Sequence, residues 1–282
     1  MTERETAAGP LHGRVALVSG ATSGIGAAVI QALAARGARI VALGRRQDRL
    51  SALSDSLGAD RCHALVADVA DAVHLADALA NLPAAFSAPD ILVNNAGVAL
   101  GDAPAQAADP DHWRRMVDTN IGGMLNLTQL LLPAMTERDF GDVVNIGSVA
   151  GRWPYRSGNV YGATKAFVHQ FTQNLRADLL GHNIRAICIE PGTVRTEFAA
   201  VRTGSAEAAR SFYARPNLME AEDVAEIVAF CLTLPRRVNI NMVEAMPLAQ
   251  SFATLAFAED MAPAATPADW RNTADDATDR GR

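Results

Sequence analysis

Short apolar runs rich in β-branched residues alternate with longer helical patterns along most of this chain. The runs occupy residues 14–19, 38–43, 62–67, 90–94, 142–147 and 184–190. Strands that alternate with helices form βαβ units, because two parallel strands need a crossover connection and a helix usually provides it. The sequence therefore predicts an α/β fold with a doubly wound parallel sheet and helices on both faces.

Two of the helical stretches have clear ends. Residues 24–37 begin with a glycine and close at Gly37, and residues 168–181 close at Gly181. Glycine is favoured just after the last turn of a helix, so both ends are helix stop signals. Apolar residues at every fourth position predict a stripe that packs in the core: Phe167, Phe171, Leu175 and Leu179.

The composition excludes several classes of protein. The formal net charge of −6 argues against a surface for nucleic acid, which needs a basic excess. Cys62, Cys188 and Cys231 are far apart, with no C-x-x-C spacing for zinc or redox chemistry. We expect reduced core cysteines, no metal and a cytoplasmic protein.

The ends of the sequence differ from the region between them. The first residues have no apolar segment typical of a signal peptide, and no later run approaches the roughly 20 apolar residues of a membrane span. We expect residues 1–12 to be a flexible N-terminus and residues 13–260 to form one domain. Residues 261–282 are rich in Ala, Pro, Asp and Thr, which predicts a disordered tail.

A glycine-rich turn follows the first predicted strand. Gly20, Gly24 and Gly26 have the spacing G-x-x-x-G-x-G and lead directly into the first helix. Glycine lets the backbone approach a pyrophosphate, and the free N–H groups of the helix N-terminus face the anion. The turn is thus a candidate nucleotide site.

The end of the second strand indicates which nucleotide binds. Gly44 stands where an NAD-binding fold usually offers an acid to the ribose, and Arg45 and Arg46 follow. Two guanidinium groups can bind a 2′-phosphate with charge-assisted hydrogen bonds, so the sequence favours NADP(H) over NAD. An exposed arginine pair that only ends a strand is the alternative.

Tyr161 and Lys165 lie four residues apart in a predicted helix. Residues at i and i+4 share one helix face, so the ammonium group can approach the phenol and favour its ionised form. A tyrosine with a lowered pKa is a candidate acid and base. A chance pair on a solvated helix is the plain alternative.

These motifs occur together with four others in a fixed order. The others are "NNAG" at 94–97, Asn120, Ser148 and "PGTVRT" at 191–196. The chain thus resembles the short-chain dehydrogenase/reductase family from residue 14 to about residue 250. Ser19 stands where the family more often has threonine, and it retains the hydroxyl group. The resemblance implies a Rossmann-type domain with about seven strands and a substrate lid at about residues 193–219.

The resemblance also implies a role for each matching position. Tyr161 would protonate a carbonyl, Ser148 would hydrogen-bond the same oxygen, and Lys165 would bind the nicotinamide ribose and lower the Tyr161 pKa. Asn120, close to the poor helix formers Gly122 and Gly123, would lie in an irregular helix and hold a water that relays protons to Lys165. The cofactor would also contact Gly20, Thr22, Ser23, Gly24, Ile25, Gly26, Arg45, Arg46, Asp68, Val69, Asn94, Asn95, Ala96, Gly97, Pro191, Gly192, Val194 and Thr196.

Further stretches resemble the NADP-dependent 3-hydroxy acid dehydrogenases within this family, which include serine and allo-threonine dehydrogenases. Their substrates are small 3-hydroxy acids, and a related branch reduces sulfoacetaldehyde. A non-catalytic NADP-binding sensor is the alternative from another class. For the substrate we predict Ser148, Tyr161 and Asn159, with Arg202 as the first choice to bind the acid and Arg152 as the reserve. The resemblance also implies a homotetramer.

Overall fold

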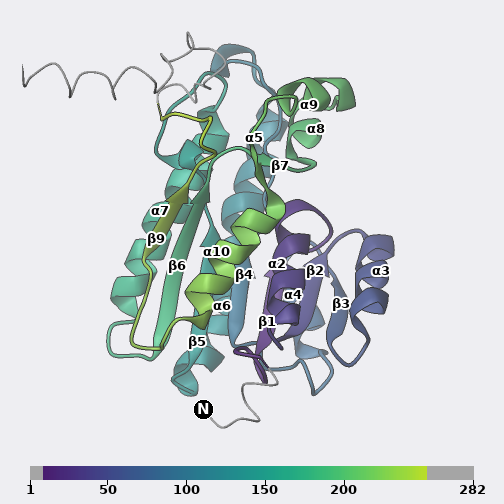
Figure 1. Ribbon diagram of the computed structural model, residues 1–282, viewed down its shortest axis with the longest axis vertical. Helices are drawn as coiled ribbons and strands as arrows, with labels where there is room; N and C mark the ends of the chain where they lie inside the picture. The colour runs from purple at the N-terminus through teal and green to yellow at the C-terminus, as the bar shows by residue number, and fades with distance from the viewer. Residues whose placement is uncertain (1–8, 253–282) are drawn as a thin grey trace, which may run out of the picture.

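Seven parallel strands form the central sheet, in the order β3-β2-β1-β4-β5-β6-β9. The protein is described by a computed structural model, which covers residues 9–252 (Figure 1). The strands are β1 (Val15–Ser19), β2 (Arg39–Gly44), β3 (Cys62–Val66), β4 (Ile91–Asn94), β5 (Gly141–Ile146), β6 (Ile184–Pro191) and β9 (Met242–Ala245). The predicted α/β fold, with its doubly wound sheet, is confirmed.

Helices cover both faces of this sheet (Figure 1). One face carries α2 (Gly24–Ala35), α3 (Gln47–Leu57) and α10 (Ala221–Thr233), and the other carries α4 (Ala72–Ala80), α6 (Gly123–Glu137) and α7 (Asn159–Asp178). In β1, Ala16 and Val18 pack on the first face, whereas Val15 and Leu17 pack on the second. Both faces are buried, which explains why this strand is a continuous apolar run.

The sheet reverses its winding between two adjacent strands. β1 pairs with β2 on one side and with β4 on the other, and the chain proceeds outward in both directions. Loops at the carboxyl ends of strands diverge at such a switch point and leave a crevice for ligands. The crevice here is covered by α8 (Phe198–Thr203) and α9 (Ala206–Phe212), and the short strands β7 (Val194–Arg195) and β8 (Met219–Glu220) pair below these helices.

The apolar stripe of α7 is only partly buried. Leu175 and Leu179 lie in the core, but Phe167 is 38% exposed and stacks on the partly buried Phe171. The prediction of a core position for Phe167 was therefore wrong. A repeat of four residues drifts by about 40° per step around a helix with 3.6 residues per turn, so the stripe leaves the core face towards the N-terminus.

Two further predictions need comment. Strand β9 was not among the predicted apolar runs, because it is a half-buried edge strand with a glutamate, Glu244.

Within the expected flexible N-terminus, Leu11 is buried and its N–H donates to Arg36 O at 2.9 Å. The expected disordered tail lies outside the described residues. The described helices include none with the length and apolar character of a bilayer crossing.

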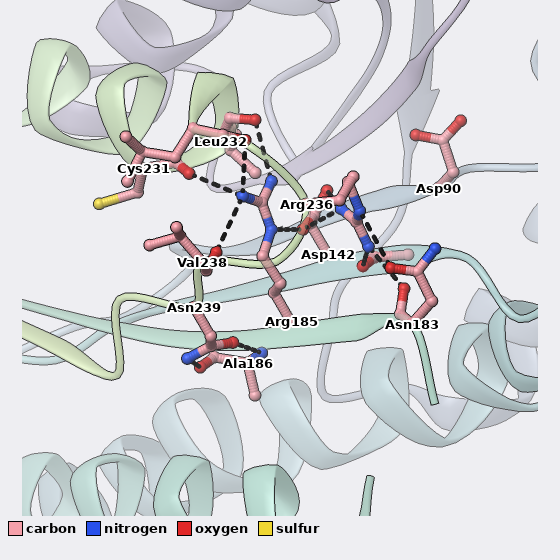
Figure 2. A network of polar contacts seen from close by, with 12 residues as sticks. Asp90, Asp142, Asn183, Arg185, Ala186, Cys231, Leu232, Arg236, Val238 and Asn239 are labelled. Carbon is pink, nitrogen blue, oxygen red and sulfur yellow. Dashed lines mark hydrogen bonds and ion pairs between the residues drawn. The ribbon is translucent and has the colours of Figure 1, made fainter. Parts of the chain in front are cut away.

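A buried charge network lies at the opposite end of the sheet from the crevice (Figure 2). Asp142 on β5 is fully buried and pairs with Arg14 at 2.8 Å, Arg185 at 2.5 Å and Arg236 at 2.8 Å. The Arg185 guanidinium also donates hydrogen bonds to the carbonyl oxygens of Cys231 and Leu232 at the end of α10. A single side chain thus satisfies helix-end carbonyls and binds the sheet to the helix.

Candidate active site

A cavity of about 420 Å³ opens at the carboxyl ends of the strands, at the switch point of the sheet. Most of the predicted site residues line it: Gly20, Thr22, Ser23, Gly24, Ile25, Arg45, Arg46, Asp68, Val69, Asn95, Gly97, Ser148, Tyr161, Lys165, Pro191, Gly192, Val194, Thr196 and Arg202. Gly26, Asn94, Ala96, Asn120, Arg152 and Asn159 are not part of the lining. Residues up to 230 positions apart in the sequence therefore form one site, because Gly20 and Gln250 both line the cavity.

The glycine turn has no room for side chains. A Cβ atom on Gly26 would lie 2.3 Å from Gly20 O, and Gly24 has a φ of 53° with Thr196 Cγ2 3.0 Å from the place of a Cβ atom. Gly24 also begins α2, and no residue in the first turn of that helix is acidic. The turn thus presents bare backbone and a helix N-terminus to the cavity, which suits a phosphate group.

Ser19 ties the glycine turn to the loop after β4. Its hydroxyl accepts hydrogen bonds from the N–H groups of Asn95 and Ala96, both at 3.0 Å. The Asn95 amide donates in return to Ser19 O at 2.9 Å. These bonds hold the glycine turn against the loop after β4 at one end of the cavity. Asn94 instead points into the protein and donates to Asn145 Oδ1 at 2.8 Å, because successive side chains of a strand point to opposite faces.

Arg46 lies across the glycine turn at one end of the cavity. Its guanidinium donates to the Thr22 hydroxyl at 2.7 Å and to the Ser23 hydroxyl at 2.7 Å. It also pairs with Glu197 at 3.0 Å. Arg45 is more exposed and pairs with Asp68 at 3.4 Å. A cation lies beside the glycine turn, and position 44 carries a glycine and not an acidic residue. This arrangement is expected at a 2′-phosphate site.

Tyr161, Lys165 and Ser148 meet at the other end of the cavity. Lys165 and Tyr161 lie on α7, with Lys165 Nζ 5.9 Å from the centroid of the Tyr161 ring. Ser148 follows β5, where its hydroxyl accepts from Ala150 N at 3.1 Å. Lys165 Nζ donates to Ile146 O at 2.7 Å, so its ammonium group is anchored to the end of β5.

The electrostatics of this pair differ from the sequence prediction. Burial raises the pKa of Tyr161, and a hydrogen bond from Ser148 and the charge of Arg202 oppose that rise. Burial also lowers the pKa of Lys165 to about 8. The pKa of Tyr161 is therefore raised and not lowered, and Arg202 is a cation whose charge opposes the rise.

Asn120 lies in an irregular helical segment, as its two following glycines predict. Residues Asp118–Gly122 form a π-helical turn between α5 (Pro110–Val117) and α6. The Asn120 amide donates to Val98 O at 2.9 Å and to Thr164 Oγ1 at 3.0 Å, and its Oδ1 accepts from Val98 N at 2.8 Å. Asn120 thereby links the loop after β4 to α7, the helix of Tyr161.

Arg202 on helix α8, within the predicted lid, reaches the same end of the cavity. Its guanidinium donates to Ser157 O at 3.0 Å and to the Tyr155 hydroxyl at 3.2 Å, and lies 5.3 Å from the centroid of the Tyr155 ring. Among residues 9–252, no carboxylate pairs with Arg202. Phe198, also on the lid, packs against the Tyr161 ring with centroids 5.4 Å apart.

Arg152 and Asn159 have other partners. Arg152 pairs with the fully buried Glu190 at 3.1 Å and with Glu244 at 3.9 Å. Two carboxylates that neutralise its guanidinium weigh against Arg152 as the cation for an acidic substrate. Asn159 is exposed at the start of α7, where its Oδ1 accepts from Val160 N at 2.7 Å.

Sequence reasoning missed several residues of the site. Tyr155, Phe198, Glu197 and Gln250 line the cavity, and Arg49 contacts Glu197 at 2.7 Å just outside it. For Arg49 a signal was present: it lies three residues after Arg46, in the first turn of α3, which begins directly after Arg46. Nothing near Gln250 in the sequence indicates that its Oε1 accepts from Thr193 N at 2.8 Å.

Comparisons with known proteins agree with this geometry. The family model described as short chain dehydrogenase matches residues 14–206. NADP-dependent 3-hydroxy acid dehydrogenase YdfG of Shigella flexneri is 48% identical over 243 residues, which cover 86% of this chain and 98% of that protein. Sulfoacetaldehyde reductase 2 of Chromohalobacter salexigens is 44% identical over 249 residues, 87% of this chain and 99% of that one.

A solved structure matches equally well. The closed form of serine dehydrogenase in complex with NADP+ superposes with a TM-score of 0.83 and 47% sequence identity. The match covers 85% of this chain and 97% of the other. The resemblance therefore covers most of this chain.

Proposed function

Because the chain belongs to the short-chain dehydrogenase family, we propose that this NADP-dependent oxidoreductase interconverts a small 3-hydroxy acid and its 3-oxo acid or semialdehyde. Candidate substrates are serine, allo-threonine, 3-hydroxypropionate and 3-hydroxyisobutyrate. Relatives named for 3-hydroxy acid and serine oxidation, which align with nearly the whole domain, support this substrate class.

The residues at the turn suit NADP(H). The bare backbone of the glycine turn would take the pyrophosphate, and Arg46, fixed by Thr22 and Ser23, would take the 2′-phosphate. Asp68 and Val69 line the region next to Arg45, where the adenine would lie. When bound, the cofactor supplies or accepts the hydride.

Tyr161 is our candidate for the acid and base. A neutral phenol is the form that donates a proton to a carbonyl oxygen, and burial keeps this phenol neutral. Ser148, beside it, would hydrogen-bond the same oxygen. Lys165 would bind the nicotinamide ribose, and its charge would favour the phenolate form when the reaction runs as an oxidation.

The single observation that carries the substrate class is the position of Arg202. Its guanidinium lines the cavity at the Tyr161 end and has no carboxylate partner among the described residues. A guanidinium binds a carboxylate with two parallel hydrogen bonds, which would also orient the carbon that exchanges the hydride.

A substrate panel tests the proposal. NADP+ reduction would be measured with serine, allo-threonine, 3-hydroxypropionate, 3-hydroxyisobutyrate and isethionate, and with neutral alcohols of similar size. We expect the 3-hydroxy acids to give the highest kcat/KM. Equal rates with neutral alcohols would contradict selection of the acid.

The same panel separates two alternatives. A sulfonate offers Arg202 the same kind of oxygen acceptors, and a relative at 44% identity is named as a sulfoacetaldehyde reductase. A preference for isethionate would therefore assign the protein to that reaction. NADPH binding without turnover of any substrate would indicate the sensor function instead.

Assembly and location are part of the proposal too. We propose a cytoplasmic homotetramer, in which the exposed aromatic end of the α7 stripe at Phe167 would be covered by another subunit. Sedimentation equilibrium of the purified protein would test the assembly.

A further inference from the structure

Glu197 joins the substrate lid to the proposed 2′-phosphate site. It is the residue immediately before lid helix α8. Its carboxylate lies between two guanidinium groups, 3.0 Å from Arg46 and 2.7 Å from Arg49. These arginines are on or next to α3 and are 151 and 148 residues away in the sequence. One side chain thus connects the lid to the start of α3, where the cofactor phosphate would bind.

Glu197 accepts hydrogen bonds from guanidinium groups that a phosphate could also bind. On Arg46, Nε and Nη2 are engaged with the hydroxyls of Thr22 and Ser23, and Nη1 donates to Glu197. Arg49 gives its Nη1 to Glu197 and, at 3.4 Å, to Thr22 O. Hydrogen bonds from Arg49 and from Arg46 lower the pKa of Glu197, so the carboxylate is ionised at neutral pH.

Two anions cannot share this pair of cations without a cost. A 2′-phosphate adds a charge of about −1.5 to −2 at neutral pH next to the carboxylate, and like charges at short range repel each other. We propose that Glu197 is an anionic latch that holds the start of the lid on Arg46 and Arg49, and that the 2′-phosphate of the cofactor releases it. NAD, which has no 2′-phosphate, would leave both ion pairs intact. This inference rests on the proposed NADP function.

The other contacts of the lid limit what the release can move. Strands β7 and β8 pair at the base of the lid, and Arg202 and Gly101 exchange hydrogen bonds at its far end. The movement would therefore centre on Glu197 and on Phe198, which packs against the Tyr161 ring. Binding of the phosphate would thereby change the surroundings of the candidate acid and base.

Binding of fragments tests the latch. The affinity of 2′,5′-ADP and of 5′-AMP would be measured by calorimetry for the wild type, Glu197→Gln, and Glu207→Gln, an exposed lid carboxylate without an ion pair in the described structure. Each exposed ion pair is worth up to about 1 kcal/mol, so we expect Glu197→Gln to bind 2′,5′-ADP about five-fold more tightly. We expect 5′-AMP to bind all three proteins equally.

Limited trypsin digestion gives a second readout, because Arg202 and Arg210 lie in the lid. We expect 2′,5′-ADP, but not 5′-AMP, to speed cleavage of the wild-type lid, and Glu197→Gln to be cleaved at the faster rate without a ligand. Unchanged or weaker binding of 2′,5′-ADP to Glu197→Gln would overturn the latch. If the wild type does not prefer 2′,5′-ADP to 5′-AMP, the proposed NADP site itself is wrong.

Discussion

The charge states of side chains at the Tyr161 end of the cavity depend mainly on burial. Burial favours the neutral form of both Tyr161 and Lys165, whose pKa values it moves in opposite directions. Arg202 is the fixed positive charge close to them. The charge of each of these side chains affects what the cavity can bind and which group can donate a proton. Each side chain therefore gives a prediction that can be measured.

Tyr161→Phe should lower kcat by about 10²-fold or more, because it removes the proton that is transferred while changing little volume. NADPH binding, followed by fluorescence, should remain close to that of the wild type. Turnover within a few-fold of the wild type would show that another group serves as the acid.

Lys165→Met tests the buried charge through stability. The folded pKa of Lys165, about 8, is below the unfolded value of about 10.4, so the unfolded chain binds more protons between these values. Below pH 8 the buried ammonium group lowers the free energy of unfolding by its full amount, and this destabilisation decreases as the pH rises. From pH 7.5 to 9.5, the free energy of unfolding of the ligand-free wild type should rise by about 2 kcal/mol relative to Lys165→Met.

Urea unfolding at the two pH values measures this difference. The comparison with the variant removes the opposite effect of buried Cys62 and Cys231, whose pKa values burial raises. The same difference between the two proteins at both pH values would contradict a lowered Lys165 pKa.

Arg202→Ala should raise the KM for the preferred 3-hydroxy acid by about 10-fold or more, which corresponds to roughly 1.4 kcal/mol. Neutral alcohols should be affected much less, and the KM for NADP+ should stay near the wild-type value. Arg210→Ala, on the exposed side of the neighbouring lid helix, is the matched control. Equal losses with acids and neutral alcohols would place the carboxylate contact elsewhere.

Helices and strands hold these side chains in place through contacts at both ends of the sheet. At the carboxyl ends, Ser19 and Asn120 connect loops and helices around the cavity. At the opposite end, Asp142 and Arg185 connect β5, β6 and the end of α10. Buried carbonyl oxygens that lose their donor remain unsatisfied, so the contacts of Arg185 predict a clear effect on stability.

Arg185→Met should lower the free energy of unfolding by about 1–3 kcal/mol, because it leaves helix-end carbonyls without their donor, whereas Asp142 keeps its ion pairs with Arg14 and Arg236. Arg237→Met, at an exposed position near the end of α10, should change it by less than about 0.5 kcal/mol. Urea unfolding of both variants provides the measurement. Similar losses in the two would contradict the role of the network.

The sequence predicted local features well and distant partnerships poorly. The apolar runs, the glycine turn and the pair of Tyr161 and Lys165 on one helix follow from short-range patterns, and the fold, the family and the cofactor were confirmed. The partner of Arg46 in the lid is 151 residues away, and the identity of neither residue indicates the other. The depth of burial that sets the Tyr161 pKa likewise depends on how the lid packs.

At the scale of the whole molecule, the cavity bridges the two halves of the sheet. The glycine turn and Arg46 belong to the half that contains β1 and β2, and Tyr161 and Ser148 belong to the half that contains β5. A ligand that spans the cavity contacts both halves and stabilises the folded state in proportion to its affinity.

Thermal unfolding should therefore distinguish the cofactors. At a concentration 100 times its Kd, NADP+ should add about 2.7 kcal/mol to the free energy of unfolding, whereas NAD+ at the same concentration should add much less. Arg46→Ala should abolish most of the difference in Tm between the two cofactors. Equal shifts with NADP+ and NAD+ in the wild type would contradict a 2′-phosphate site.

The π-helical turn at Asp118–Gly122 has a consequence for the evolution of this chain. Deleting one of its residues would replace the wide turn, closed by i→i+5 hydrogen bonds, with a regular α-helical turn and would leave α6 in nearly the same orientation. Asn120, which the wide turn carries to Val98 and Thr164, would then be displaced from both partners. Most surface loops accept changes in length. This segment, in contrast, should tolerate substitution more readily than insertion or deletion. Its length should therefore be inherited nearly unchanged among descendants that keep the site.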